Sequence, residues 1–260
     1  MLKNIALFLG GLGFLSVLLF YTSSHSILEP LFSHTCPDST DMNCILKVLT
    51  DISVERGLPE GFRALREHYA AVPDFRPNCH SMALSLGEAL AHRLPHYEEL
   101  TFTPESAACN YGFFQSYPND LLLSGAPIAY VSAFCKDIGT QMKDAVPDLE
   151  DECFRGIGRA LPFIDETSLG DSIKMIAFAD TTCTEISPGP QQYRFCLSGA
   201  FNQLGRKEAT EDYGLSVDEE NPLLLCERQQ GVAKESCDGN CQWTAHCLFL
   251  GEGDFSTGLQ

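Results

Sequence analysis

A short pattern, Cys-x-x-Gly, occurs three times along the chain at a nearly fixed spacing. The copies begin at Cys109, Cys153 and Cys196, which are 44 and 43 residues apart, and Cys237 follows 41 residues later. A second cysteine series runs beside the first at intervals of 48 and 43 residues, and its members are Cys135, Cys183 and Cys226. A fixed period of about 40 residues is typical of stacked supersecondary units. The chain therefore resembles a set of repeats, each with two regularly placed cysteines.

The glycines of the pattern are Gly112, Gly156 and Gly199. A cysteine and a glycine three residues apart lie on one face of a helix, and a glycine there allows another backbone to come close. We therefore expect each copy to lie in a helix, at the point where a disulfide joins the two helices of one repeat.

The chain has an even number of cysteines, twelve in 260 residues, and no Cys-x-x-Cys pair. Disulfides in an oxidising compartment explain this composition. The two series suggest the pairs Cys79–Cys109, Cys135–Cys153, Cys183–Cys196 and Cys226–Cys237, with Cys36–Cys44 and Cys241–Cys247 completing the set. Twelve cysteines can pair in about 10,000 ways, so the sequence alone leaves the connectivity open.

The N-terminus begins with a short segment containing Lys3, followed by an apolar run over residues 5–21 that only Ser16 interrupts. This length is near the lower limit of a membrane-spanning helix and above that of a usual cleaved signal. We expect an uncleaved transmembrane signal anchor over residues 1–21, with the rest outside the cytoplasm. Cleavage near Ser24, which would give a secreted or periplasmic protein, is the alternative.

The remaining chain shows helical periodicity and no alternating strand pattern. A linker over residues 22–40 should lead to a disulfide-rich helical domain over residues 41–250, followed by a tail over residues 251–260. The expected helices cover residues 41–56, 59–72, 78–94, 103–118, 165–180 and 191–204, with two more starting at residues 127 and 148. The predicted fold class is all-α: disulfide-stapled helical-hairpin repeats, like an α/α solenoid, behind one N-terminal transmembrane helix.

The charge of the chain is strongly negative, with 35 acidic and 17 basic residues and a formal net charge of −18. Nucleic acids and anionic lipid surfaces bind clusters of lysine and arginine, so this balance argues against both as partners. It suits a soluble extracytoplasmic surface, or a surface that meets a basic partner.

Three segments around the repeats resemble a poorly characterised bacterial family of membrane-anchored, extracytoplasmic α-helical proteins. In that family the motifs read Cys-His-x-x-x-His, Cys-x-His-Gly and Glu-Cys-x-His-Gly-x-Gly-His. The corresponding segments here begin at Cys79, Cys109 and Glu152, and the resemblance covers roughly residues 75–205. Only His80 keeps a histidine of these motifs, because the other positions hold Leu84, Tyr111, Arg155 and Arg159. Any metal or catalytic centre that the family's histidines form is therefore lost in this chain.

A few residues have the chemistry of metal ligands: His80, Cys237, Cys241, His246 and Cys247. Thiolates and imidazoles at short spacing suit tetrahedral zinc, but cysteines outside the cytoplasm more often form disulfides. A single histidine on a half-buried helix is usually hydrogen-bonded rather than metal-bound. We therefore expect no metal site and no cofactor.

These features favour a non-catalytic function. The prediction is a membrane-anchored extracytoplasmic helical-repeat scaffold or accessory subunit that binds a protein partner, which could belong to a membrane complex. The anchor would place it as a single-pass protein in a bacterial inner membrane, with its domain in the periplasm. The alternative is an extracytoplasmic metal-dependent hydrolase or redox enzyme that uses His80, His246 and nearby acids.

Overall fold

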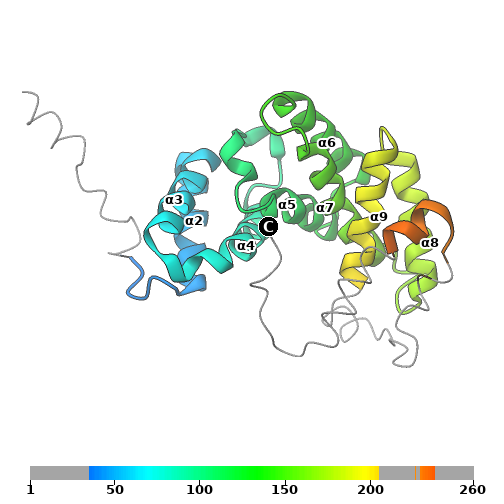
Figure 1. Cartoon of the computed structure of the whole chain (residues 1–260), viewed down its shortest axis with the longest axis horizontal. Coiled ribbons are helices and arrows are strands. Elements are labelled where there is room, and N and C mark those ends of the chain that lie inside the picture. Colours follow the sequence, from blue (N-terminus) through cyan, green and yellow to red (C-terminus); the bar gives the residue numbers. More distant parts are fainter. Residues whose placement is uncertain (1–34, 205–225, 227–228, 238–260) are drawn as a thin grey trace, which may run out of the picture.

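The computed structural model of the chain describes residues 35–204, 226 and 229–237, and this part is helical without a strand (Figure 1). The α-helices are α2 (Met42–Arg56), α3 (Leu58–Ala71), α4 (Cys79–Arg93), α5 (Gly112–Leu123), α6 (Ile128–Met142), α7 (Leu149–Ile164), α8 (Ser172–Ile186) and α9 (Pro190–Leu204). Short 3-10 helices cover Pro73–Asn78, Tyr97–Glu99 and Pro104–Ala107, and residues 231–237 are also helical. Within these ranges no helix is long and apolar enough to cross a membrane. The predicted anchor over residues 1–21 and the tail over residues 251–260 lie outside the described residues.

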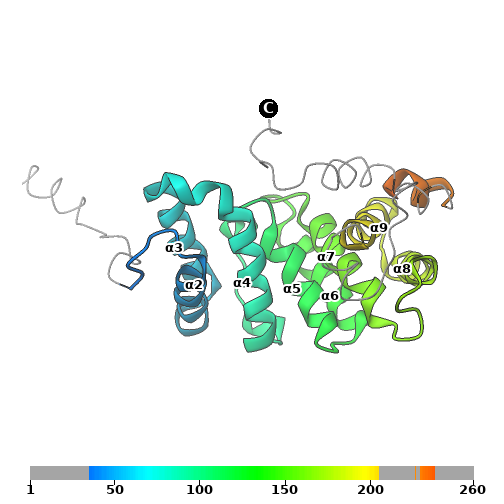
Figure 2. The same cartoon turned by 90° about the horizontal axis from the view of Figure 1, so that it is seen from below.

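Four helices, α4, α5, α7 and α9, pack side by side in one row, which Figure 2 shows from below. The hydrogen bonds between α7 and α9 follow the same order along both helices. The carboxylate of Asp151, early in α7, accepts hydrogen bonds from Gln191 and Gln192 at the start of α9. Eight residues later, Arg159 donates to Gln203 near the end of α9. The two helices therefore run in the same direction.

Glycines allow neighbouring helices of this row to pack backbone against backbone, and we call these contacts the seams of the row. A Cβ atom on Gly112 of α5 would lie 2.8 Å from the carbonyl oxygen of His80 in α4. A Cβ atom on Gly156 of α7 would lie 2.7 Å from the carbonyl oxygen of Phe114 in α5, and one on Gly199 of α9 would overlap the backbone of Arg155 in α7. Real Cβ atoms do not approach backbone oxygens so closely, so each seam requires glycine.

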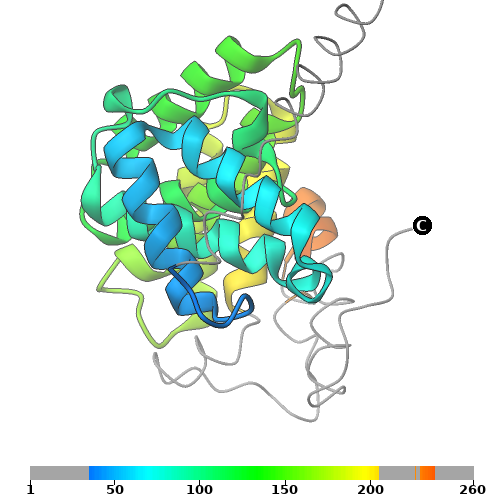
Figure 3. The same cartoon turned by 90° about the vertical axis from the view of Figure 1, so that its left-hand side faces the viewer.

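Helices α2 and α3 cover one end of the row, which faces the viewer in Figure 3. The side chain of Asp41 caps α2 by accepting from the backbone amides of Asn43 and Cys44. Gly57, at φ +95°, joins α2 to α3 in a conformation that favours glycine. The preceding segment is packed too, because His68 of α3 donates from Nε2 to the carbonyl oxygen of Ser39 at 2.8 Å. The end of the predicted linker is therefore part of this packed surface.

The core is richest in aromatic side chains where α5 and α6 meet the segment before Pro104. The rings of Phe113 and Tyr117 are stacked with centroids 5.2 Å apart, and Phe134 of α6 contacts Tyr117 edge-on at 5.5 Å. Tyr117 is fully buried, and its hydroxyl donates to the carbonyl oxygen of Leu94 at 2.7 Å. This bond satisfies the one polar group that the ring brings into the core.

The predicted helix over residues 103–118 is wrong at both ends. The segment starts as a 3-10 turn, turns left-handed at Cys109, and becomes α-helical only at Gly112. The helix then continues through Pro118 to Leu123. Proline lacks the amide that would bond the carbonyl of Phe114, and Gly156 of α7 packs against both that carbonyl and the Pro118 ring. A tertiary contact thus accommodates a proline that sequence rules treat as a helix end.

The predicted helix over residues 165–180 begins later than expected. Asp165 does not start it, because its carboxylate accepts from the backbone amide and the hydroxyl of Thr167 in a local turn. Helix α8 starts at Ser172, capped by Asp171, and runs past Cys183 to Ile186. Asp165 and Asp171 could each cap the helix, and Asp171 is the one that does.

Candidate functional site

Five disulfides join the described cysteines: Cys36–Cys44, Cys79–Cys109, Cys135–Cys153, Cys183–Cys196 and Cys226–Cys237. Their Cα–Cα separations lie between 5.3 and 5.8 Å, within the range that a disulfide requires. Four of them are the pairs that the two cysteine series suggested, and Cys36–Cys44 is a pair that was predicted to complete the set. The last predicted pair, Cys241–Cys247, lies outside the described residues. Five disulfides indicate an oxidising, extracytoplasmic compartment.

The cysteine and the glycine of a Cys-x-x-Gly copy contact different helices in two of the three copies. Cys153 of α7 bonds Cys135 of α6, whereas Gly156 packs against α5. Cys196 of α9 likewise bonds α8, while Gly199 packs against α7. The expectation that the glycine makes room for the disulfide partner is therefore wrong for these copies. The cysteine holds the hairpin together, and the glycine holds one hairpin against the preceding helix of the row.

The first copy differs because its cysteine is not helical. Cys109, Asn110 and Tyr111 have φ values of 58°, 55° and 59°, and they are the only described non-glycine residues with positive φ. This left-handed conformation costs roughly 1–2 kcal/mol per residue. The turn is fixed from two sides, by the Cys79–Cys109 disulfide and by His80, whose Nδ1 donates to the carbonyl oxygen of Cys109 at 3.0 Å. Strained turns held in this way cluster at functional sites.

The carboxylate of Glu152 lies beside this turn and connects α5 to α7. Gln115 of α5 donates from Nε2 to Glu152 Oε2 at 2.9 Å and to the carbonyl oxygen of Asn110 at 3.4 Å. Arg155, one turn further along α7, places its Nε 3.3 Å from the same carboxylate oxygen. Burial raises the pKa of Glu152, and the positive charge of Arg155 and the hydrogen bond from Gln115 oppose this rise.

Tyr111 is the last residue of the left-handed turn. Burial raises the pKa of its phenol, and the negative charges of Asp148 and Glu152 raise the pKa further. The ring is half-buried, and the two carboxyl groups are close enough to affect its ionisation. The phenol of Tyr111 therefore holds its proton more firmly than that of a free tyrosine.

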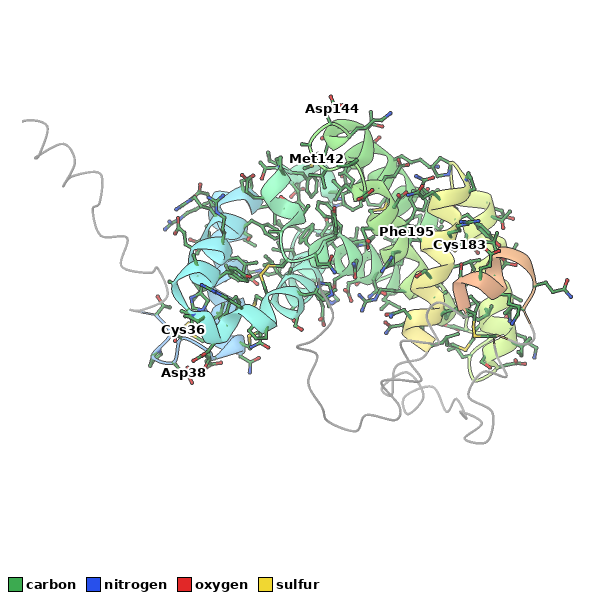
Figure 4. The ribbon with its side chains drawn as sticks, in the orientation of Figure 1. Cys36, Asp38, Met142, Asp144, Cys183 and Phe195 are labelled. Carbon is green, nitrogen blue, oxygen red and sulfur yellow. A yellow bond between two sulfur atoms is a disulfide. The ribbon has the colours of Figure 1, made fainter. Side chains whose placement is uncertain are left out.

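Arg155 also contacts the next helix of the row. Its guanidinium carbon lies 4.7 Å from the ring centroid of Phe195, in the range of a cation–π contact. Figure 4 shows Phe195 on the side of α9 that faces α7, and Cys183 on the neighbouring α8. The side chain of Arg155 remains 34% exposed, compared with 13% for Glu152. We call Tyr111, Gln115, Glu152, Arg155 and Phe195 the Glu152 cluster.

The Glu152 cluster takes Tyr111 from the segment that begins at Cys109, and Glu152 with Arg155 from the segment that begins at Glu152. His80, from the segment that begins at Cys79, lies outside the cluster and bonds the turn that carries Tyr111. Gln115 and Phe195 lie outside those segments, and no sequence signal marked them. An arrangement of hydroxyl, amide, carboxylate and guanidinium groups beside an aromatic ring can recognise a polar group through several hydrogen bonds at once.

The candidate metal ligands are not brought together in the described part of the chain, where no group of three histidine, cysteine or acidic side chains could hold a metal ion. Cys237 is bonded to Cys226, so its sulfur does not offer the thiolate that zinc requires. His80 lies instead at the left-handed turn. Cys241, His246 and Cys247 lie outside the described residues.

Comparison with family models, curated proteins and solved structures finds no match to this chain.

Proposed function

We propose that the protein is a helical-repeat scaffold or accessory subunit that binds a protein partner through the Glu152 cluster. The observation that carries this proposal is the line of partly exposed side chains across the row of helices. Tyr111 precedes α5, Arg155 lies on α7 and Phe195 lies on α9. Gln115 of α5 donates to Glu152 of α7, Glu152 forms an ion pair with Arg155, and the Arg155 guanidinium contacts the Phe195 ring. Tyrosine, arginine and other aromatic side chains are enriched in the energetically important centres of protein interfaces.

Rigidity supports the same function. The hairpins α6–α7 and α8–α9 each carry a buried disulfide, and glycine seams fix α5, α7 and α9 in contact with their neighbours. A surface that is ordered before binding loses little conformational entropy when it binds. Stacked helix pairs of this kind form the extended binding surfaces of solenoid proteins, so we propose that the hairpins are repeats of an α/α solenoid.

The proposal extends to the location of the protein. The apolar run over residues 5–21 would anchor the chain as a single-pass protein in a bacterial inner membrane, with the disulfide-bonded domain in the periplasm. The family resemblance of residues 75–205 supports the same arrangement.

Site-specific photo-crosslinking in the native membrane tests the binding surface. A photoreactive phenylalanine analogue at Phe195 should form one discrete crosslinked product with another protein. The matched control is Tyr69 of α3, which is 40% exposed and lies at the end of the row. Arg155→Ala should reduce the yield from the Phe195 position, because it removes the charge held over this ring. A product that forms equally from Tyr69, or no product from Phe195, would contradict the proposed surface.

A further inference from the structure

The Cys79–Cys109 disulfide is more accessible than three of the other described disulfides. Both cysteines are fully buried in each of the pairs Cys135–Cys153, Cys183–Cys196 and Cys226–Cys237. Cys109 is only half-buried and belongs to the turn before α5. A disulfide is reduced when a thiolate attacks one of its sulfurs, so access to the sulfur limits the rate. The turn therefore leaves the Cys79–Cys109 disulfide more accessible than the buried disulfides of the hairpins.

The partner cysteine lies where two helices join. Cys79 is the first residue of α4, and its amide donates to the carbonyl oxygen of Arg76 in the 3-10 helix Pro73–Asn78 that leads into α4. The positive end of a helix dipole favours a thiolate in the first turn, and a thiol of lower pKa leaves faster. Cys44, the other half-buried cysteine among the described residues, also lies in a first turn, but beside a carboxylate. The carboxylate of Asp41 already accepts from the Cys44 amide at 3.2 Å, and its negative charge opposes a thiolate there.

The conformation around Cys109 also changes the balance between the oxidised and the reduced form. The disulfide holds one end of three consecutive left-handed residues. Breaking the bond allows the turn to relax, and the relief of this strain favours the reduced form. Relaxation would also disturb the contacts of the turn with His80 and with Gln115.

We propose that the Cys79–Cys109 disulfide is a redox-sensitive latch, opened by a dithiol, that controls the position of Tyr111 in the Glu152 cluster. One thiolate of the dithiol attacks the sulfur of Cys109, a mixed disulfide forms, and Cys79 leaves as a thiolate that then takes up a proton. The second thiol of the dithiol attacks the mixed disulfide and releases Cys109 as a thiol. The dithiol becomes a disulfide, and two electrons and two protons pass to the protein. The latch does not depend on the proposed protein partner.

Stepwise reduction of the full-length oxidised protein tests the latch. Aliquots are treated with increasing dithiothreitol, trapped with N-ethylmaleimide and analysed by peptide mass spectrometry. Among the ten cysteines of the five disulfides described above, Cys79 and Cys109 should be labelled at the lowest dithiothreitol concentration, while Cys135 and Cys153 stay protected. Labelling of another of these pairs before Cys79 and Cys109, or of all pairs together, would overturn the proposal.

A pair of variants tests the contribution of the backbone. Glycine adopts the left-handed conformation without the steric cost, so Tyr111→Gly should stabilise the oxidised form and raise the dithiothreitol midpoint of Cys79–Cys109 about tenfold. Tyr111→Phe keeps the backbone cost and removes only the hydroxyl, so its midpoint should stay that of the natural protein. Equal midpoints for the two variants would show that the turn stores no strain that reduction releases, and would overturn the latch.

Discussion

Gly199 of α9 lies directly against the main chain of Arg155 in α7, where any Cβ atom would overlap the Arg155 carbonyl group. The two residues belong to consecutive Cys-x-x-Gly segments, since Arg155 precedes Gly156 and Gly199 ends the third copy. One copy of the motif therefore packs onto the previous copy. The regular spacing of the motif along the chain reflects this contact between neighbouring helices of the row.

A Cβ atom at this seam should destabilise the domain. Gly199→Ala should lower the free energy of unfolding by about 1–3 kcal/mol, the usual cost of overpacking a core, because both sides of the contact are helical backbone that cannot move separately. The natural comparison is Gly189→Ala, whose Cβ would meet only the flexible amide end of Gln192 at 3.1 Å. Urea unfolding of both variants measures the difference, and equal losses would show that the seam is not rigid.

The disulfide inside the α6–α7 hairpin should make a large contribution to stability. Replacing Cys135 and Cys153 together with serine avoids a free thiol and should cost about 2–5 kcal/mol, the usual loss for a native disulfide. The corresponding replacement of Cys36 and Cys44 should cost less, because that bond closes 8 residues rather than 18 and a shorter loop restricts the unfolded chain less. Urea denaturation gives both values, and the opposite order would contradict the loop-length argument.

The sequence predicted most of the helices and the described disulfides for one shared reason. Both depend on short-range or periodic signals, such as Asp41 before α2, Gly57 after it and the recurring cysteine spacing. The left-handed turn at Cys109 has no such signal, because the disulfide and the contact with His80, both to residues about 30 positions earlier, help to hold it. The passage of α5 through Pro118 likewise depends on Gly156, which is distant in sequence.

The Glu152 cluster was less predictable than the fold. Glu152 lies in the acidic first turn of α7, where a carboxylate stabilises the helix dipole and needs no other role. Gln115, which donates to Glu152, is 37 residues away, and Phe195 lies 40 residues after Arg155, whose guanidinium contacts its ring. Only the packing of three helices brings these residues together. The motif comparison named Tyr111 and Arg155 only as positions that lack a histidine, and it predicted no site there.

The oxidation state of the cysteines gives a direct prediction for the natural protein. The ten cysteines of the five described disulfides should resist alkylation under denaturing conditions without reductant, and all should react after reduction. Mass spectrometry of alkylated peptides from protein isolated from its host measures this. Alkylation of Cys135, Cys153, Cys183 or Cys196 before reduction would contradict both the hairpin disulfides and the oxidising compartment.

The buried carboxyl group of Glu152 should make the stability of the domain depend on pH. Because burial raises its pKa in the folded state above the ordinary 4.5, the folded protein holds this proton more tightly than the unfolded chain. The resulting stabilisation is fully present below the ordinary pKa and is lost as pH rises through the raised pKa of the folded state.

Glu152→Gln has no proton to lose, and its amide oxygen can still accept from Gln115. The natural protein should therefore lose stability relative to Glu152→Gln as pH rises from about 4 to about 8. Glu88→Gln on the exposed side of α4 controls for the removal of one negative charge. Urea unfolding across this pH range compares the three proteins, and a constant difference between the natural protein and Glu152→Gln would show that this carboxyl group keeps the same pKa on unfolding.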